Sequence, residues 1–308
     1  MKKKYALTGL SIAVGGVMLV TSAFASATGS TGYDTYKSAI KSTLTSKNFT
    51  ENGTIIVKDN GKEFSNINNT IKENTAKESL SQNTVIKIGG QTKTLETYWQ
   101  DGKTVSKDST SNIYSVRTIN KNKKFNGNKA EIGKIDSSKL NDGEMLLDAL
   151  VGNLQNYVTL DSKEDGTKDV AITLTDSQIP AVANAAASIL VKNLANNDNE
   201  MGREKDFSSL KKDIVGSIPK LESDIRIDNV SLKAEISKDN YITSQVADVS
   251  ISGKDAEGIV HAITLDLNLN LSQFNNTTPD KVDLTGKQVK SITNKEGFRH
   301  GNKDEQDD

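Results

Sequence analysis

The sequence predicts an α+β fold in which a large antiparallel β-sheet is covered on one face by a few α-helices. The clearest observation is an alternation over residues 259–271, where Ile, His and Leu take the odd positions and mainly small or polar residues the even ones. A period of two over this length is typical of a long strand with one dry face. Turn dipeptides such as Asn60-Gly61 and Gly89-Gly90 separate further β-branched runs. Two apolar helical stripes complete the pattern.

The first 27 residues have the three parts of a secretory signal peptide. Three lysines at positions 2–4 are followed by an apolar run over residues 10–20 and by the small-residue site Ala25-Ser26-Ala27. The alternative is an uncleaved anchor, but the run is shorter than the roughly 20 residues of a spanning helix. We therefore expect cleavage, no transmembrane anchor afterwards, and a secreted or cell-envelope protein. The Lys- and Asn-rich, cysteine-free composition suggests a Gram-positive source.

A first helix and a meander of strands are predicted for residues 33–119. Apolar residues at positions 33, 36, 40 and 44 recur at helical steps, which indicates a helix over residues 33–47. Strands are expected at residues 54–57, 64–71, 84–88, 92–100, 103–106 and 113–119, with Asp101-Gly102 as one of their turns. Many of these strands are polar on both faces.

Two main helices are predicted between the strand groups. Leucines and valines over residues 146–158 form a wide apolar stripe. After a hairpin turn at residues 164–167 and a strand at 170–174, a second helix begins at Asp176 or Ser177 and runs to about Leu194. Pro180 then lies in its first turn, where the missing N–H leaves no bond unmade. A further short helix is expected within residues 207–218.

Three long antiparallel strands close the fold. Apolar residues alternate over residues 230–236, 247–251 and 259–271. Ile227 is out of register with Val230, which predicts a β-bulge near Asp228-Asn229. We expect one domain over residues 28–293, preceded by the signal peptide at 1–27 and followed by a disordered acidic tail at 294–308.

Composition excludes several classes of function. The chain has 39 basic and 40 acidic residues; the leader carries three lysines and no acid, so cleavage changes the net charge from −1 to −4. This balance argues against nucleic acid, which binds through clustered positive charge. The absence of cysteine excludes a thiol nucleophile, thiolate zinc sites and a lipid-modified cysteine. With no catalytic or phosphate-binding motif either, we expect no cofactor, no metal and no enzyme.

Few residues are candidates for chemistry. His261 lies on the apolar face of the last long strand, where we favour a hydrogen-bonded core or rim histidine over a titrating pocket residue. Residues 161–169 resemble part of an EF-hand loop, but Lys163 and Ile172 break the ligand set, so a hairpin turn is favoured. Trp99, the only tryptophan, is either a core anchor or an aromatic at the rim of a ligand site.

The order of elements resembles the LolA/LppX-like exported proteins, which include lipoprotein carriers and lipid-binding lipoproteins. The similar local pieces are Thr97-Tyr98-Trp99-Gln100-Asp101-Gly102-Lys103 and residues 228–287, which include Thr278-Pro279-Asp280 and end Leu284-Thr285-Gly286-Lys287. The resemblance implies a curved antiparallel sheet, an unclosed half-barrel, with helices in its mouth and an apolar cavity for acyl chains. The chain departs from the family's lipoproteins in lacking the lipobox cysteine, and no functional residue carries over.

The expected function is non-catalytic binding of a lipid or acyl chain in a cavity between the curved sheet and the helices. The alternative is an envelope sensor or protein-interaction module of the same fold with a filled core. Several oxygens converging beside His261 would instead favour an enzyme. The expected partner is accordingly a hydrophobic small molecule or a protein. The candidate lining residues are Trp99, Leu150, Val249, Ile251, Leu265, Leu267 and Leu269.

Overall fold

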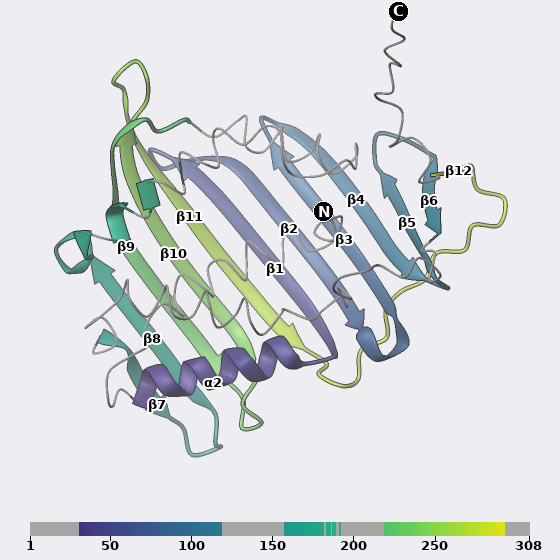
Figure 1. The fold of residues 1–308 in the computed structure, drawn as a ribbon, viewed down its shortest axis with the longest axis horizontal. Coiled ribbons are helices and arrows are strands. Elements are labelled where there is room, and N and C mark those ends of the chain that lie inside the picture. Colours follow the sequence, from purple (N-terminus) through teal and green to yellow (C-terminus); the bar gives the residue numbers. More distant parts are fainter. Residues whose placement is uncertain are drawn as a thin grey trace, which may run out of the picture.

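The computed structural model describes residues 31–118, 157–181, 183–185, 187–188, 191 and 219–292. These residues form one 12-stranded sheet in the order β12-β6-β5-β4-β3-β2-β1-β11-β10-β9-β8-β7 (Figure 1). Neighbouring strands are antiparallel, as in β1 and β11, except that β12 runs parallel to β6. The sheet does not close on itself, so the predicted large, open antiparallel sheet is confirmed.

The first strands follow the predicted meander. Helix α2 (Thr31–Thr45) precedes β1, and the turns at Asn60-Gly61 and Asp101-Gly102 adopt the positive φ values that such turns require. Strands β1 to β3 are longer than predicted, because polar residues beyond the apolar runs also pair, whereas β6 is shorter than the predicted 113–119. Strands β1 to β6 span Asn48–Asp59, Lys62–Asn74, Ser79–Ile88, Gln91–Gln100, Lys103–Asp108 and Tyr114–Thr118, with the 3₁₀ helix η1 (Thr75–Lys77) between β2 and β3.

The closing strands are also as predicted. The pairing of β9 with β10 shifts from Ser250 opposite Asn229 to Ile251 opposite Ile227, so Asp228 is the extra residue of the expected bulge. Strand β11 then pairs with β1 and so joins the strands β1 to β6 and the strands β7 to β10 into one sheet. Strands β7 to β12 span Thr159–Ser162, Lys168–Thr175, Ser223–Ile236, Ile242–Lys254, Val260–Ser272 and Val289–Ser291.

The start of the predicted second helix was wrong. Residues Asp176–Gln178 form a separate 3₁₀ helix, η3, in which the Thr175 N–H donates to Gln178 Oε1 at 2.9 Å. Ile179 is extended because a following proline disfavours the α region. The N–H groups of residues 183 and 184 then donate to the Pro180 carbonyl, so a second helical segment begins here. The leader, the tail, residues 207–218 and most of residues 146–158 lie outside the described residues.

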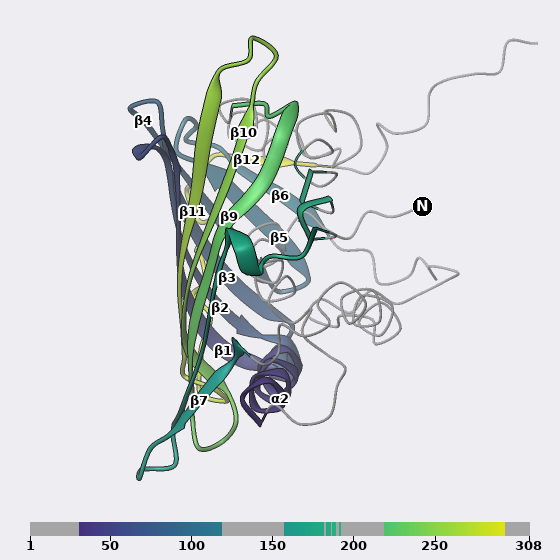
Figure 2. The ribbon, with the colours of Figure 1, turned by 90° about the vertical axis from the view of Figure 1, so that its left-hand side faces the viewer.

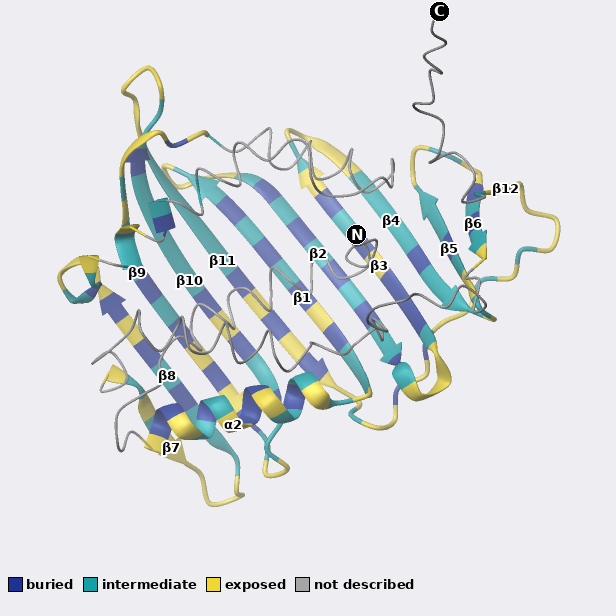
Figure 3. Cartoon of the chain, in the orientation of Figure 1, coloured by how far each residue is buried: buried dark blue, intermediate teal, exposed yellow. Residues whose placement is uncertain are grey.

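The larger of two hydrophobic clusters lies on one face of the sheet, and α2 packs on this face. Buried α2 side chains such as Tyr36 and Ile40 join Leu232 of β9 and Leu267 of β11 in one cluster. Figure 2 shows α2 on one side of the curved sheet, across its lower end. We call this side the inner face and the opposite side the outer face. Buried residues form bands across the strands (Figure 3).

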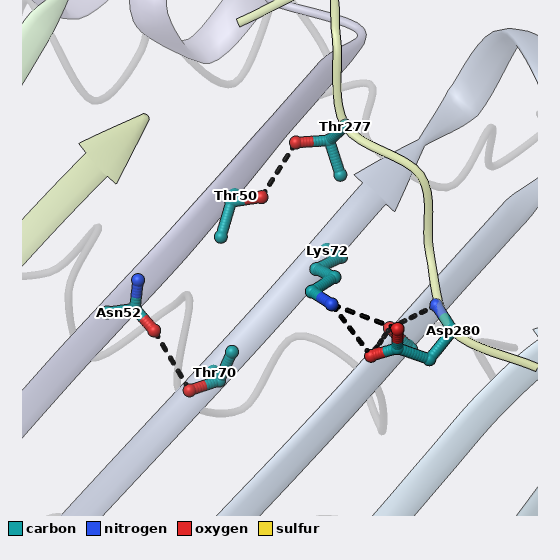
Figure 4. Close-up of polar contacts among 7 residues, drawn as sticks. Thr50, Asn52, Thr70, Lys72, Thr277 and Asp280 are labelled. Atoms are coloured by element: carbon teal, nitrogen blue, oxygen red, sulfur yellow. Dashed lines mark hydrogen bonds and ion pairs between the residues drawn. The ribbon is translucent and has the colours of Figure 1, made fainter. Parts of the chain in front are cut away.

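A C-terminal strap, residues 273–287, crosses the outer face from β1 towards β6. Thr277 bonds Thr50 at 2.7 Å, and Asp280 accepts from Lys72 Nζ at 2.9 Å (Figure 4). Further on, the Val282 N–H donates to Gln100 Oε1 at 2.9 Å. The strap thus contacts Gln100 near the end of β4.

Candidate ligand-binding face

The inner face of the sheet has an apolar half. It consists of the inner-face residues of β8, β9, β10 and β11, together with Ile55 and Val57 of β1. Ile55 lies opposite Leu267, and Leu267 also lies opposite Ala247. Ala247 in turn lies opposite Leu232. Because directly paired residues present their side chains on the same face, these residues form one apolar row across four strands.

The structure brings five of the predicted lining residues together in this half. Leu267 is 2% exposed and Leu269 is fully buried, whereas Val249, Ile251 and Leu265 are half-buried. Leu265 lies directly opposite Val249. The buried fraction of these side chains therefore decreases along β11 with distance from α2. The half-buried residues form the part of the apolar half that remains in contact with solvent.

The other two predicted residues do not belong to this group. Trp99 lies on β4, opposite Leu80 of β3, and is half-buried. Its indole Nε1 is buried and has no hydrogen-bond partner, which is unusual for a tryptophan in a protein interior. Leu150 lies outside the described residues.

The second half of the inner face mixes buried apolar residues, such as Ile67 and Ile86, with buried polar ones. Asn69, Gln82 and Thr84 are all buried and form one network. The Asn69 Oδ1 atom accepts from Thr84 Oγ1 at 2.8 Å and from Gln82 Nε2 at 3.0 Å. We call the inner-face residues of β2 to β6, with Glu51 of β1, the polar half. Its polar side chains interrupt the apolar rows and include Glu51, Ser65, Asn69, Glu73, Gln82, Thr84, Thr97 and Trp99.

Two carboxyl groups lie next to each other in the polar half. Glu51 is opposite Ile71, and Glu73 is opposite Phe49, so the two acids are diagonal neighbours on the same face. Glu51 is only 5% exposed. Burial, and secondly the charge of Glu73, raise the pKa of Glu51 to about 7. Burial also raises the pKa of Glu73. Glu51 therefore gains or loses its proton near neutral pH, beside a second buried acid.

Several polar atoms of this face have no hydrogen-bond partner. In addition to Trp99 Nε1, they are Glu51 Oε1, Glu73 Oε1, Asn69 Nδ2, Ser65 Oγ and, at the border with the apolar half, Gln245 Nε2. Buried polar groups are normally paired, since each unpaired one costs about 1–3 kcal/mol. This concentration of unpaired donors and acceptors on a single face indicates a candidate ligand-binding site.

His261 lies near the start of β11, between two aspartates. Its Nδ1 lies 2.9 Å from Asp59 Oδ2, and its Nε2 lies 3.2 Å from Asp255 Oδ2. The hydrogen bond to Asp59, followed by that to Asp255, raises the pKa of His261 against the opposing effect of burial. Carboxylate oxygens therefore do converge beside His261, and they engage both ring nitrogens. The arrangement is the hydrogen-bonded rim histidine that we favoured.

Sequence reasoning missed the carboxyl pair and the amide network. The strands that carry Glu73 and Gln82 are polar on both faces, so no alternation indicated which side chains point inward. For Glu51 a signal existed, because it continues the odd-numbered inner series of Gly53, Ile55 and Val57 on β1.

Comparison with known proteins identifies no family. No family model and no curated protein matches the chain. A matching solved structure is the beta-barrel-like protein of domain of unknown function DUF1849 from Brucella abortus, which is 10% identical and covers 73% of this chain and 98% of its own. Its TM-score is 0.16, too low to support a conclusion about this chain. Within the described residues, no helix is long and apolar enough to cross a membrane.

Proposed function

We propose that this chain is a non-catalytic exported protein that binds a lipid or acyl chain between the curved sheet and its helices. One observation carries the proposal: an apolar half and a polar half with unpaired groups adjoin on the same inner face. An amphipathic ligand matches this arrangement, with its chain on the apolar half and its polar end on the polar half. The resemblance in layout to LolA/LppX-like proteins supports the same function.

The energetics favour an acyl chain on the apolar half. Val249, Ile251 and Leu265 are half-buried, so they retain apolar surface that a ligand would remove from water. Each Å² of such surface contributes about 25 cal/mol on burial. We therefore place the chain along this end of β10 and β11, beyond the residues that α2 covers.

The alternative functions do not need a lipid on the inner face. An envelope sensor or protein-interaction module would have a filled core and would bind a protein elsewhere. An enzyme would use His261, but a general base needs a ring nitrogen free to meet substrate, and both nitrogens are engaged by Asp59 and Asp255. The ligand-binding function requires neither a free base nor a nucleophile.

Native mass spectrometry of the mature protein from its own host tests the proposal. We expect a bound lipid that organic extraction releases. Replacing the half-buried Leu265 by Trp should then fill the site and abolish uptake of a fluorescent fatty acid. Thr264→Trp, the next residue of β11 and on the outer face, is the matched control. A bare mass, with uptake unchanged in folded Leu265→Trp, would favour the protein-binding alternative.

A further inference from the structure

Both ring nitrogens of His261 face a carboxylate, and the two carboxylates come from different segments of the chain. Asp59 ends β1, and its Oδ2 lies 2.9 Å from Nδ1. Asp255 follows β10, and its Oδ2 lies 3.2 Å from Nε2. Ionised carboxylates only accept hydrogen bonds, and a neutral imidazole has one N–H donor where a protonated one has two. Both contacts are therefore hydrogen bonds only while His261 is positively charged.

Asp255 belongs to the loop between β10 and β11, residues 255–259, which extends beyond the neighbouring strands (Figure 2). The Asp255 N–H donates to the Ile259 carbonyl at 3.0 Å, and the Ile259 N–H donates to Asp255 Oδ1 at 2.7 Å. These bonds lie within the loop, so they hold its shape but not its position. The contact of Asp255 with His261 ties the loop to β11 and, through Asp59, to the end of β1.

The two carboxylates differ in the hydrogen bonds that they keep when the ring loses a proton. Asp59 Oδ1 is buried and has no hydrogen-bond partner, so this carboxylate depends on its bond with His261. Asp255 retains the N–H of Ile259. Because an unpaired carboxylate in a partly buried position is costly, the remaining ring proton stays on the Asp59 side. Nε2 then presents a lone pair to Asp255, and the two acceptors repel each other.

The surroundings of His261 leave these two acids as its main charged neighbours. Gly253 of β10 lies opposite His261, and the side chains of Leu221 and Ile225 pack over this glycine, so this side is apolar. Other charged residues at this end of the sheet include Lys62 and Glu63 of β2, Glu222 and Asp224 at the start of β9, Lys254 of β10 and Glu257 of the loop. Lys254 is paired with Asp224 at 2.7 Å.

We propose that His261 is a pH-dependent switch that fixes the 255–259 loop while the ring carries two protons and releases it when one proton is lost. The charged ring binds both acids and holds the loop against the ends of β1 and β11. The neutral ring keeps Asp59 and loses Asp255, so the loop, with its exposed Ile259, moves away from the sheet. Histidine titrates close to physiological pH, and a rise in pH therefore operates the switch. The switch does not require a bound ligand.

Spin labelling tests the proposal on the mature protein. The chain has no cysteine, so Ala256→Cys provides a single labelling site in the exposed loop. We expect the mobility of this label, measured by electron paramagnetic resonance, to increase with pH at the same midpoint as the His261 ring titration measured by NMR. A label at Asp239→Cys, in the exposed turn between β9 and β10, is the matched control and should not respond.

Three substitutions in the labelled protein identify the group that controls the loop. His261→Gln removes the titrating ring, so label mobility should no longer depend on pH. Asp255→Asn keeps an oxygen for the Ile259 N–H and gains an amide that donates to a neutral ring nitrogen, so the loop should stay fixed at every pH. His300→Gln replaces the only other histidine and should leave the response unchanged. Circular dichroism establishes that each variant is folded.

Two kinds of result would overturn the proposal. In the first, the Ala256→Cys label keeps the same mobility while the His261 ring titrates. In the second, the pH response persists in His261→Gln or in Asp255→Asn, because another group then controls the loop. Neither result involves a lipid, so failure of the switch leaves the proposed function intact, and failure of lipid binding leaves the switch intact.

Discussion

The apolar and polar halves of the inner face share one sheet and one pattern of alternation, but they differ in what their buried side chains do. In the apolar half, residues such as Leu232 and Leu267 lie directly across from apolar partners. In the polar half, buried amides and carboxyls retain unpaired atoms. The first arrangement stabilises the fold, whereas the second destabilises it.

This difference teaches where to look for function. Burying an unpaired polar group is unfavourable. Stability therefore does not explain why several such groups lie on one face. Native proteins depart from stable packing mainly at functional sites. The unpaired polar groups of the polar half are what distinguishes this sheet from a plain hydrophobic core.

The largest effect is expected from truncating the apolar half. Leu232 is 2% exposed and lies between Ile172 and Ala247. Leu232→Ala should lower the free energy of unfolding by about 2–5 kcal/mol, because it removes transfer energy and leaves a cavity. Leu95→Ala is the matched control in the polar half, where the half-buried Leu95 faces Thr84. Urea denaturation measures both. A loss at Leu95 as large as that at Leu232 would remove the energetic distinction between the halves.

The second-largest effect tests how much the polar half lowers the free energy of unfolding. The pKa of Glu51 is about 7 in the folded protein, against an ordinary 4.5. The folded state therefore holds this proton more tightly than the unfolded state, and stability falls as pH rises from about 4.5 to 7. Glu51→Gln removes the titrating group. The free energy of unfolding of this variant should exceed that of the parent, and the difference should grow across this pH window to roughly 3 kcal/mol at pH 8.

Thermal or urea unfolding at pH 4, 6 and 8 measures this change. Glu235→Gln, in which an exposed acid is replaced, should leave the pH profile as it is in the parent. A Glu51→Gln profile parallel to that of the parent would mean that Glu51 is solvated, and the polar half would then lose its main destabilising member.

The sequence predicted the apolar half much better than the polar one. Leu265, Leu267 and Leu269 follow a strict period of two, which defines both the strand and its dry face. The bulge at Asp228 is visible in the same way, as a change of phase. Both signals are local, so a single sequence reveals them.

The polar half depends on non-local pairing. Nothing near Glu51 in the chain indicates that Glu73 will be its diagonal neighbour, because the register of β1 with β2 decides this. Gln245 meets this region only because β11 joins β10 to β1. By contrast, the misplaced helix start at Asp176 was a local error, since the restriction that Pro180 imposes on Ile179 was available from sequence.

The smallest effect lies at the far end of the apolar half, where His261 caps the inner row. Because carboxylates raise the pKa of His261, its contribution to stability is complete below the ordinary value of 6.5 and is lost as pH rises through the folded value. Asp59→Asn should lower the pKa of His261, since the Asp59 hydrogen bond is the largest cause of the shift. NMR titration of the His261 ring protons measures this, with Asp283→Asn in the strap as control. An unchanged titration in Asp59→Asn would show that packing alone holds this end of the apolar half. A lowered pKa would show that a charged hydrogen bond between Asp59 and His261 links the end of β1 to the start of β11.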